Sequence, residues 1–101
     1  SVLDSPFDTD HPDLAGKFTT GYSGNDGSTN VKCTQGACTE THGTFVSGII
    51  AAQKNSAGMH GVAYGATIKP VTIFSSSGTY NVTSAQLANA VAAGSGSGRC
   101  F

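Results

Sequence analysis

The chain contains 101 residues, a length that suits one folded domain and leaves no room for two. Charged residues account for 11% of it, against roughly 25% in an average soluble domain, and the formal net charge is -1. Because Lys and Arg form no cluster, the composition argues against nucleic acid and anionic membranes as partners. No apolar run is long enough to span a bilayer, and the low charge with abundant Gly, Ser and Thr is typical of compact secreted proteins.

The first predicted element is a strand that ends at Asp4. The apolar pair Val2-Leu3 precedes this carboxylate, and Pro6 cannot continue a hydrogen-bonded ladder. Asp4 should therefore lie at the carboxyl end of a strand, where α/β folds place their functional sites. Since the chain opens inside this strand, we expect it to be a piece of a longer protein.

A turn is predicted at residues 11–14, because Pro12 presets the backbone and Asp13 can bond back to it. Residues 15–40 are then polar and rich in glycine. Within them, residues 21–28 are typical of a surface loop.

Two of the three cysteines lie in this polar stretch. The short spacing of Cys33 and Cys38 suits a small disulfide loop in an oxidising compartment. Together with His42 they could instead bind zinc, for which His60 is the candidate fourth ligand. We favour the disulfide because finger-like spacing is missing, and we find no obvious partner for Cys100.

Residues 41–52 are predicted to form a helix that is buried on every side. Large apolar side chains recur four positions apart, and small residues form a stripe between them. The large residues are Phe45, Val46, Ile49 and Ile50, and the small ones are Gly43, Ser47 and Ala51.

The one ionisable group of this helix is His42, in the first turn. Unpaired backbone N–H groups and the helix dipole disfavour a positive charge there, so we expect a neutral imidazole near pH 7. A neutral histidine at a helix start can serve as a general base. The alternative is a buried structural histidine that caps its own helix.

The second half of the chain predicts one more strand and one more helix. After a loop at residues 53–65, the β-rich stretch 66–74 is expected to be a strand, which Pro70 weakens by removing a ladder bond. Thr83 and Gln86 have the spacing of a capping box that opens a helix through residue 93. Its expected apolar face and its end are marked by Leu87, Val91 and Gly94. Alternating strands and helices imply a parallel sheet with crossovers.

Three segments together resemble the amino-terminal half of a subtilase, the family of subtilisin-like serine peptidases. They are V-L-D-S-P-F-D-T-D-H-P-D-L at 2–14, H-G-T-F-V-S-G at 42–48 and G-V-A at 61–63. The resemblance implies a three-layer α/β/α fold with a mainly parallel sheet, of which residues 1–101 are the amino-terminal portion, truncated at both ends. It also implies a secreted or cell-surface serine endopeptidase that acts on proteins or peptides.

By this resemblance Asp4 is similar to the aspartate of the catalytic triad and His42 to its histidine. The histidine would move a proton between a serine hydroxyl and the leaving amine, while the aspartate orients the ring and stabilises the imidazolium. Such chemistry needs no cofactor. The nucleophilic serine and the oxyanion donor belong to the missing remainder of the domain, so we nominate no serine of this chain and expect it to be inactive alone.

Two further assignments follow from the same resemblance. A structural calcium ion would take oxygen ligands from Asp13, Gln53, Asn55, Ala57 and Met59. The residues Gly78 and Thr79 match a strand edge that pairs with an extended substrate, although the same loop could be only a turn.

The chain departs from the family pattern at three positions, which keeps two other functions open. Pro6 replaces a glycine near the aspartate, where it could shift the carboxylate. Phe45 replaces a second histidine, and Tyr64 replaces a proline after Gly-Val-Ala. The alternatives are a catalytically dead subtilase-like scaffold or adhesin, and a small binding module stabilised by a disulfide or zinc.

Overall fold

The computed structural model describes residues 1–33, 41–56, 59–75 and 79–95. Their sheet consists of three short parallel strands, β1 (Val2–Asp4), β2 (Tyr22–Ser23) and β3 (Pro70–Thr72), in the order β1-β3-β2. Thr72 is paired with Asp4 on one side and with Ser23 on the other. The carboxyl ends of all three strands therefore meet at one edge of the sheet.

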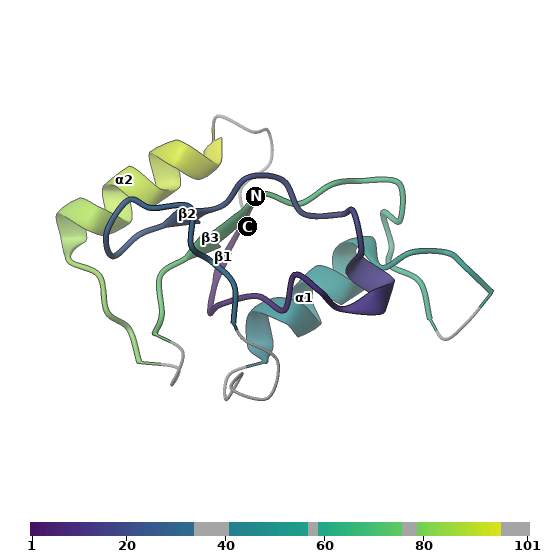
Figure 1. Cartoon of the computed structure of the whole chain (residues 1–101). Coiled ribbons are helices and arrows are strands. Elements are labelled where there is room, and N and C mark those ends of the chain that lie inside the picture. Colours follow the sequence, from purple (N-terminus) through teal and green to yellow (C-terminus); the bar gives the residue numbers. More distant parts are fainter. Residues whose placement is uncertain (34–40, 57–58, 76–78, 96–101) are drawn as a thin grey trace.

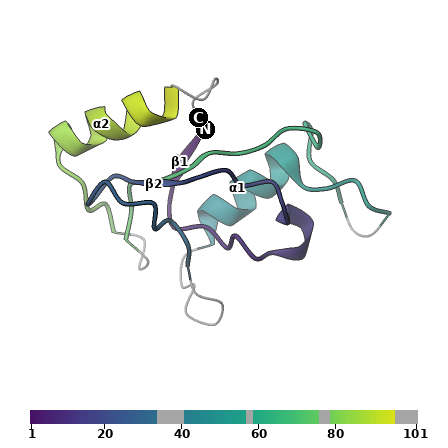
Figure 2. The same ribbon diagram turned by 45° about the horizontal axis from the view of Figure 1, so that its top comes forward.

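Two helices cover the two faces of this sheet. Helix α1 (His42–Ala51) lies on one side of the strands, and α2 (Ser84–Ser95) lies on the other (Figure 1). Figure 2 shows the same layering after a turn of the molecule, with the short 3-10 helix η1 (Pro12–Leu14) beside α1. The predicted three-layer α/β/α arrangement with a parallel sheet is confirmed. None of the described helices combines the length and the apolar character needed to cross a membrane.

The central strand contains the proline that we expected to weaken it. Pro70 is the first residue of β3, a position at which its missing N–H group interrupts little of the ladder. The strand is shorter than the predicted 66–74, since before it only an isolated bridge joins Ile68 to Phe18.

The prediction of a surface loop at residues 21–28 is wrong at its start, because β2 lies there. Gly24 donates its N–H group to the Thr72 carbonyl at 2.8 Å, and an added Cβ would lie only 2.8 Å from that oxygen. The glycines that indicated a loop instead allow this segment to approach the central strand closely.

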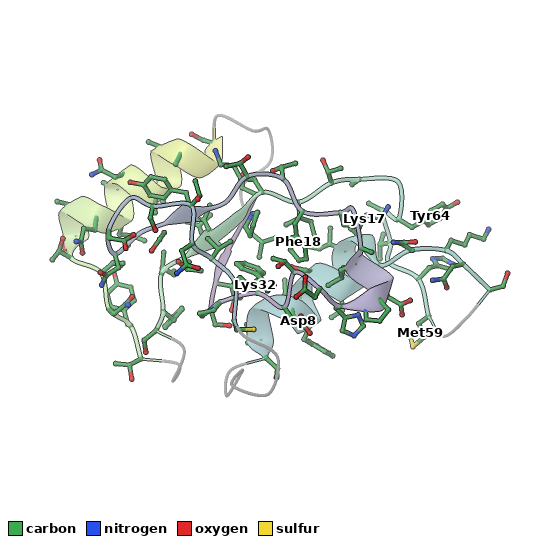
Figure 3. The ribbon with its side chains drawn as sticks, in the orientation of Figure 1. Asp8, Lys17, Phe18, Lys32, Met59 and Tyr64 are labelled. Atoms are coloured by element: carbon green, nitrogen blue, oxygen red, sulfur yellow. The ribbon has the colours of Figure 1, made fainter. Side chains whose placement is uncertain are left out.

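The core lies between the sheet and α1. Its buried members are Val2, Phe7, Val31, Ala51 and Ile68, against which Phe18, Val46 and Ile50 pack. The rings of Phe7 and Phe18 meet edge to face, with centroids 5.8 Å apart. Phe18, which belongs to the segment that joins η1 to β2, is labelled in Figure 3.

Helix α1 differs from its prediction in burial. Its small residues Gly43, Ser47 and Ala51 face the core, but the side chains of Phe45 and Ile49 are 67% and 53% exposed. These two line an open groove of about 610 Å³ that also contacts η1. The sequence pattern indicates that every face of the helix is apolar, but it does not indicate which segment of the chain covers each face. The prediction of burial on every side is therefore wrong for the face that contains Phe45 and Ile49.

The carboxyl end of α1 is closed by a distant segment, residues 61–63. The N–H groups of Gly61, Val62 and Ala63 donate to the carbonyls of Ala52, Ile49 and Ile50 at 2.7–2.9 Å. A Cβ on Gly61 would lie 2.5 Å from the backbone nitrogen of Ala51, so this contact requires glycine. The segment therefore satisfies carbonyls that have no partner within the helix.

Helix α2 begins as predicted and packs differently. Thr83 donates its N–H group to Gln86 Oε1 at 2.8 Å, and Gln86 donates its N–H group to Thr83 Oγ1 at 3.2 Å, which confirms the capping box. The buried positions are Ala90 and Gly94, whereas Val91 of the predicted apolar face is exposed. Small residues face the sheet here, and a Cβ added to Gly24, the residue directly after β2, would already be in van der Waals contact with the Cβ of Ala90 at 3.6 Å.

Candidate active site

The structure brings Asp4 and His42 together at the edge where the strands end. Asp4 is the last residue of β1, and His42 is the first residue of α1. His42 Nδ1 lies 2.9 and 2.8 Å from the two carboxylate oxygens of Asp4. The Asp4 side chain is 13% exposed and that of His42 is 66% exposed. The carboxylate is thus sheltered, while the ring extends toward solvent.

This contact determines what the imidazole can do. An ionised carboxylate only accepts hydrogen bonds, so Nδ1 must carry the proton that lies between the two groups. In the neutral ring, Nε2 is then the nitrogen with the lone pair, and it lies across the ring from the carboxylate. Ser5 donates its N–H group to Asp4 Oδ1 at 2.7 Å and so helps to orient the carboxylate. Such a pair can accept a proton at Nε2 and stabilise the resulting cation.

Three contacts around the Asp4–His42 pair were not predicted from the sequence. Ser5 Oγ accepts the N–H group of Gly43 at 3.0 Å, and Thr44 Oγ1 accepts the N–H group of Asp8 at 2.9 Å. A Cβ on Gly43 would lie 2.6 Å from the Ser5 carbonyl oxygen, so the two backbones approach closely here. The available signal was a small residue directly after each member of the pair.

The departures from the family pattern leave this geometry intact. Pro6 does not displace the carboxylate, since both Asp4 oxygens remain within 2.9 Å of His42 Nδ1. Phe45 points into the open groove. Tyr64 lies at the far end of the molecule from α2, where its backbone carbonyl accepts a hydrogen bond from Lys17 (Figure 3).

The residues considered for calcium gather in part. Gln53 donates its N–H group to the Asp13 carbonyl at 2.9 Å, and Asn55 Nδ2 lies 3.1 Å from Asp13 Oδ1. Met59 is 86% exposed (Figure 3), and Ala57 lies outside the described residues. Within the described part of the chain, no three His, Cys, Asp or Glu side chains converge as metal ligands. The amide nitrogens of Asn55 and Gln53 donate to Asp13 Oδ1 and to the Ala15 carbonyl, so the amide oxygens of these two residues are not the atoms bonded there, and calcium binding stays a prediction.

The segment considered for substrate binding is closed on itself where it is described. Ser75 donates its N–H group to the Thr79 carbonyl at 2.7 Å, and Thr79 donates its own to Ser75 Oγ at 3.2 Å. Beside this turn, the rings of Phe74 and Tyr80 meet with centroids 5.8 Å apart. Gly78 lies outside the described residues, so pairing with a substrate stays a prediction.

Of the cysteines, only Cys33 lies in the described part of the chain. It is buried, and its N–H group donates to the Phe7 carbonyl at 3.0 Å. Cys38 and Cys100 lie outside the described residues, so the pairing of Cys33 with Cys38 stays a prediction. His60, the fourth ligand of the zinc alternative, packs its ring on Tyr64 with centroids 5.0 Å apart.

The fold and the site together define an α/β protein with a carboxylate–histidine pair at the carboxyl edge of its sheet. The profile of the subtilase family matches residues 1–96, and the chain belongs to that family. Fervidolysin of Fervidobacterium pennivorans is 40% identical over 74 residues, which cover 73% of this chain. A crystal structure of fervidolysin, described as a keratinolytic enzyme related to subtilisin, aligns with 90% of this chain at 32% identity and a TM-score of 0.74.

The chain spans only a small part of the length of fervidolysin. The matched residues make up 11% of the fervidolysin sequence, and the structural alignment covers 14% of the solved fervidolysin chain. The relationship to subtilisin-like peptidases predicted from the three sequence segments is confirmed, as is the fold class.

Proposed function

We propose that this chain supplies the acid–base half of the active site of a subtilisin-like serine endopeptidase. The observation that carries the proposal is the contact of His42 Nδ1 with the Asp4 carboxylate at 2.8–2.9 Å. In this role His42 accepts the proton of a serine hydroxyl as the hydroxyl attacks a peptide carbonyl. His42 then returns the proton to the leaving amine, while Asp4 orients the ring and stabilises the imidazolium. The nucleophile and the oxyanion donor come from the remainder of the catalytic domain.

The substrate class follows from the family to which the chain belongs. Subtilases are peptidases, so the substrate is a protein or peptide chain held near the carboxyl edge of the sheet. In this proposal Gly78 and Thr79 offer main-chain groups to the extended substrate, and the substrate replaces the bonds that Thr79 makes to Ser75. Keratinolytic activity is a property of fervidolysin, and the substrate preference of the present enzyme does not follow from it.

Peptide hydrolysis by the complete enzyme, meaning the protein that contains this chain and the downstream half of the domain, tests the proposal. Hydrolysis should be abolished by His42→Ala and retained by His11→Ala, an exposed histidine of the same chain. A complete protein that binds peptides but hydrolyses none would instead support the catalytically dead scaffold.

We further propose that Asp13, Gln53, Asn55, Ala57 and Met59 hold a structural calcium ion in the complete enzyme. Asp13 would contribute its carboxylate, the amide side chains their oxygens, and the loop its backbone carbonyls. The gathering of Asp13, Gln53 and Asn55 by hydrogen bonds supports this placement. The ion would stabilise the loop after α1, and it takes no part in proton transfer.

Removing calcium should lower the melting temperature of the complete enzyme by roughly 5–10 °C relative to saturating calcium. The reason is that a ligand bound only to the folded state stabilises that state by mass action. Differential scanning calorimetry with chelator and with added calcium measures the shift. Asp13→Asn should remove the calcium-dependent part of the melting temperature. Asp10→Asn should retain it, because the Asp10 carboxylate pairs with Lys32 and is not a proposed ligand. Equal melting temperatures with and without calcium would exclude the site.

We also propose that Cys33 and Cys38 form a disulfide and that the enzyme is secreted or exposed at the cell surface. The sulfur of Cys33 is bonded as in a disulfide, which supports the first part and argues against a zinc-bound Cys33 thiolate. Disulfides persist in oxidising compartments, which supports the second part.

Alkylation without reductant should leave Cys33 and Cys38 unmodified and should label Cys100. Mass spectrometry of the resulting peptides identifies each cysteine separately, and reduction before alkylation should make all three reactive. Labelling of all three cysteines without reductant, or one zinc ion retained per chain, would reverse the assignment.

A further inference from the structure

The helix that carries His42 is not capped by its own N-terminal residue. Thr41 is the N-cap residue of α1, and its side chain makes no capping hydrogen bond. The first N–H groups of a helix have no partner within the helix and need an acceptor elsewhere. The N–H group of Gly43 finds that acceptor in Ser5 Oγ, 3.0 Å away and 38 positions earlier in the sequence. The cap is therefore supplied by the segment that follows β1.

The same Ser5 is bonded to the carboxylate of the pair. Its N–H group donates to Asp4 Oδ1 at 2.7 Å, while its hydroxyl oxygen holds Gly43, the residue after His42. These contacts close a ring, which we call the Ser5 ring. It consists of two peptide links, Asp4-Ser5 and His42-Gly43, and of two non-covalent contacts that join them. One side of the ring is the contact between the Asp4 carboxylate and His42 Nδ1.

The Ser5 ring has little freedom to distort. Ser5 is 2% exposed, so water does not readily replace it as the acceptor for Gly43. The backbone of Gly43 lies so close to Ser5 that an added Cβ would sit 2.6 Å from the Ser5 carbonyl oxygen. Loss of the bond from Ser5 to Gly43 would therefore free the start of α1 to shift relative to the end of β1.

We propose that Ser5 is a positioning residue for proton transfer, because its buried hydroxyl caps α1 from the end of β1 and so fixes His42 against Asp4. This inference rests on the proposed catalytic role of Asp4 and His42. A displacement of about 1 Å in a catalytic group can lower a rate by roughly 100-fold, so a small shift of the helix start is enough to be measured.

Steady-state kinetics of the complete enzyme test the proposal against a purely structural role of the hydroxyl. Ser5→Ala should lower kcat by roughly 10- to 100-fold with KM changed by less than about 2-fold, because proton transfer is impaired and peptide binding is not. Ser5→Thr, which keeps the hydroxyl, should restore most of kcat. Ser5→Cys keeps the size of the side chain and offers only a weak acceptor, so it should lower kcat in the same direction as Ser5→Ala.

Ser47→Ala is the matched control. Ser47 is also a fully buried serine bonded to Gly43, but its hydroxyl donates to the Gly43 carbonyl at 2.8 Å, inside the helix. Both alanine variants lose one buried hydroxyl, and only Ser5→Ala loses the connection to β1. Ser47→Ala should therefore keep kcat within about 2-fold of the parent, since its hydroxyl takes no part in positioning His42.

The proton between Asp4 and His42 provides a second readout. Its strongly deshielded NMR resonance should be present in the parent and in Ser47→Ala, and weakened or lost in Ser5→Ala. Unchanged kcat and resonance in Ser5→Ala, or equal losses in Ser5→Ala and Ser47→Ala, would overturn the proposal. If His42→Ala itself retains hydrolysis, the catalytic assignment of the pair fails, which separates that failure from a failure of the Ser5 proposal.

Discussion

His42→Ala should lower kcat for peptide hydrolysis by the complete enzyme about 10⁶-fold, and Asp4→Asn should lower it about 10⁴-fold. Without His42 no group accepts the proton of the attacking serine. In Asp4→Asn the ring remains, but an amide in place of the carboxylate can favour the wrong tautomer and stabilises the imidazolium less. The unequal losses reflect the unequal roles of the two side chains.

Single-turnover and steady-state kinetics at saturating peptide measure both losses. The double variant should be no slower than His42→Ala alone, because the two residues act as one unit and their effects are not additive. Asp10→Asn serves as the matched control for Asp4→Asn, since Asp10 is exposed and pairs with Lys32. Losses below about 10-fold in both variants would remove Asp4 and His42 from the catalytic machinery.

The second large effect is complete inactivity of the 101-residue chain when it is made alone. It carries the groups that orient and move a proton, and we assign the nucleophile and the oxyanion donor to the remainder of the domain. The exposed groove along α1, which Phe45 and Ile49 line, should also make the isolated chain prone to aggregate.

A covalent probe directed at activated serines should label the complete enzyme and leave the isolated chain unlabelled. Light scattering should show the isolated chain aggregating, and Ile49→Ser should reduce the aggregation because it removes exposed apolar surface. Clean labelling of a soluble isolated chain, abolished by His42→Ala, would show that a nucleophile lies among these residues.

The sequence was most informative where structure depends on neighbouring residues. The capping box of Thr83 and Gln86 is a local hydrogen-bond pattern, and it opens α2 where it was predicted. The strand end at Asp4 was marked by the apolar pair before it and by the proline shortly after it. The contact between Asp4 and His42 was expected from the resemblance, because spacing alone does not bring positions 4 and 42 together.

The sequence was least informative where structure depends on distant partners. Strand β2 has two residues and exists because the central strand β3, about fifty positions later, accepts it. Leu87 and Val91 were expected to mark the apolar face of α2, but the buried positions are Ala90 and Gly94, and Ala90 lies against the segment that follows β2. The bond between Ser5 and Gly43 joins residues 38 positions apart, and although both are small, their types do not specify that they pair.

The caps on α1 have a consequence for the order of folding. The helix has ten residues, fewer than the roughly 12–15 at which an isolated helix becomes even marginal, and glycines and β-branched residues make up most of it. Its N-terminal donor is satisfied by Ser5, and its C-terminal carbonyls by residues 61–63. In a nascent chain that lacks either segment, we therefore expect residues 42–51 not to form a stable helix. The contact between Asp4 and His42 therefore forms only with the tertiary structure. A ribosome-bound precursor should lack proton-transfer activity until the segments before and after α1 have packed against the helix.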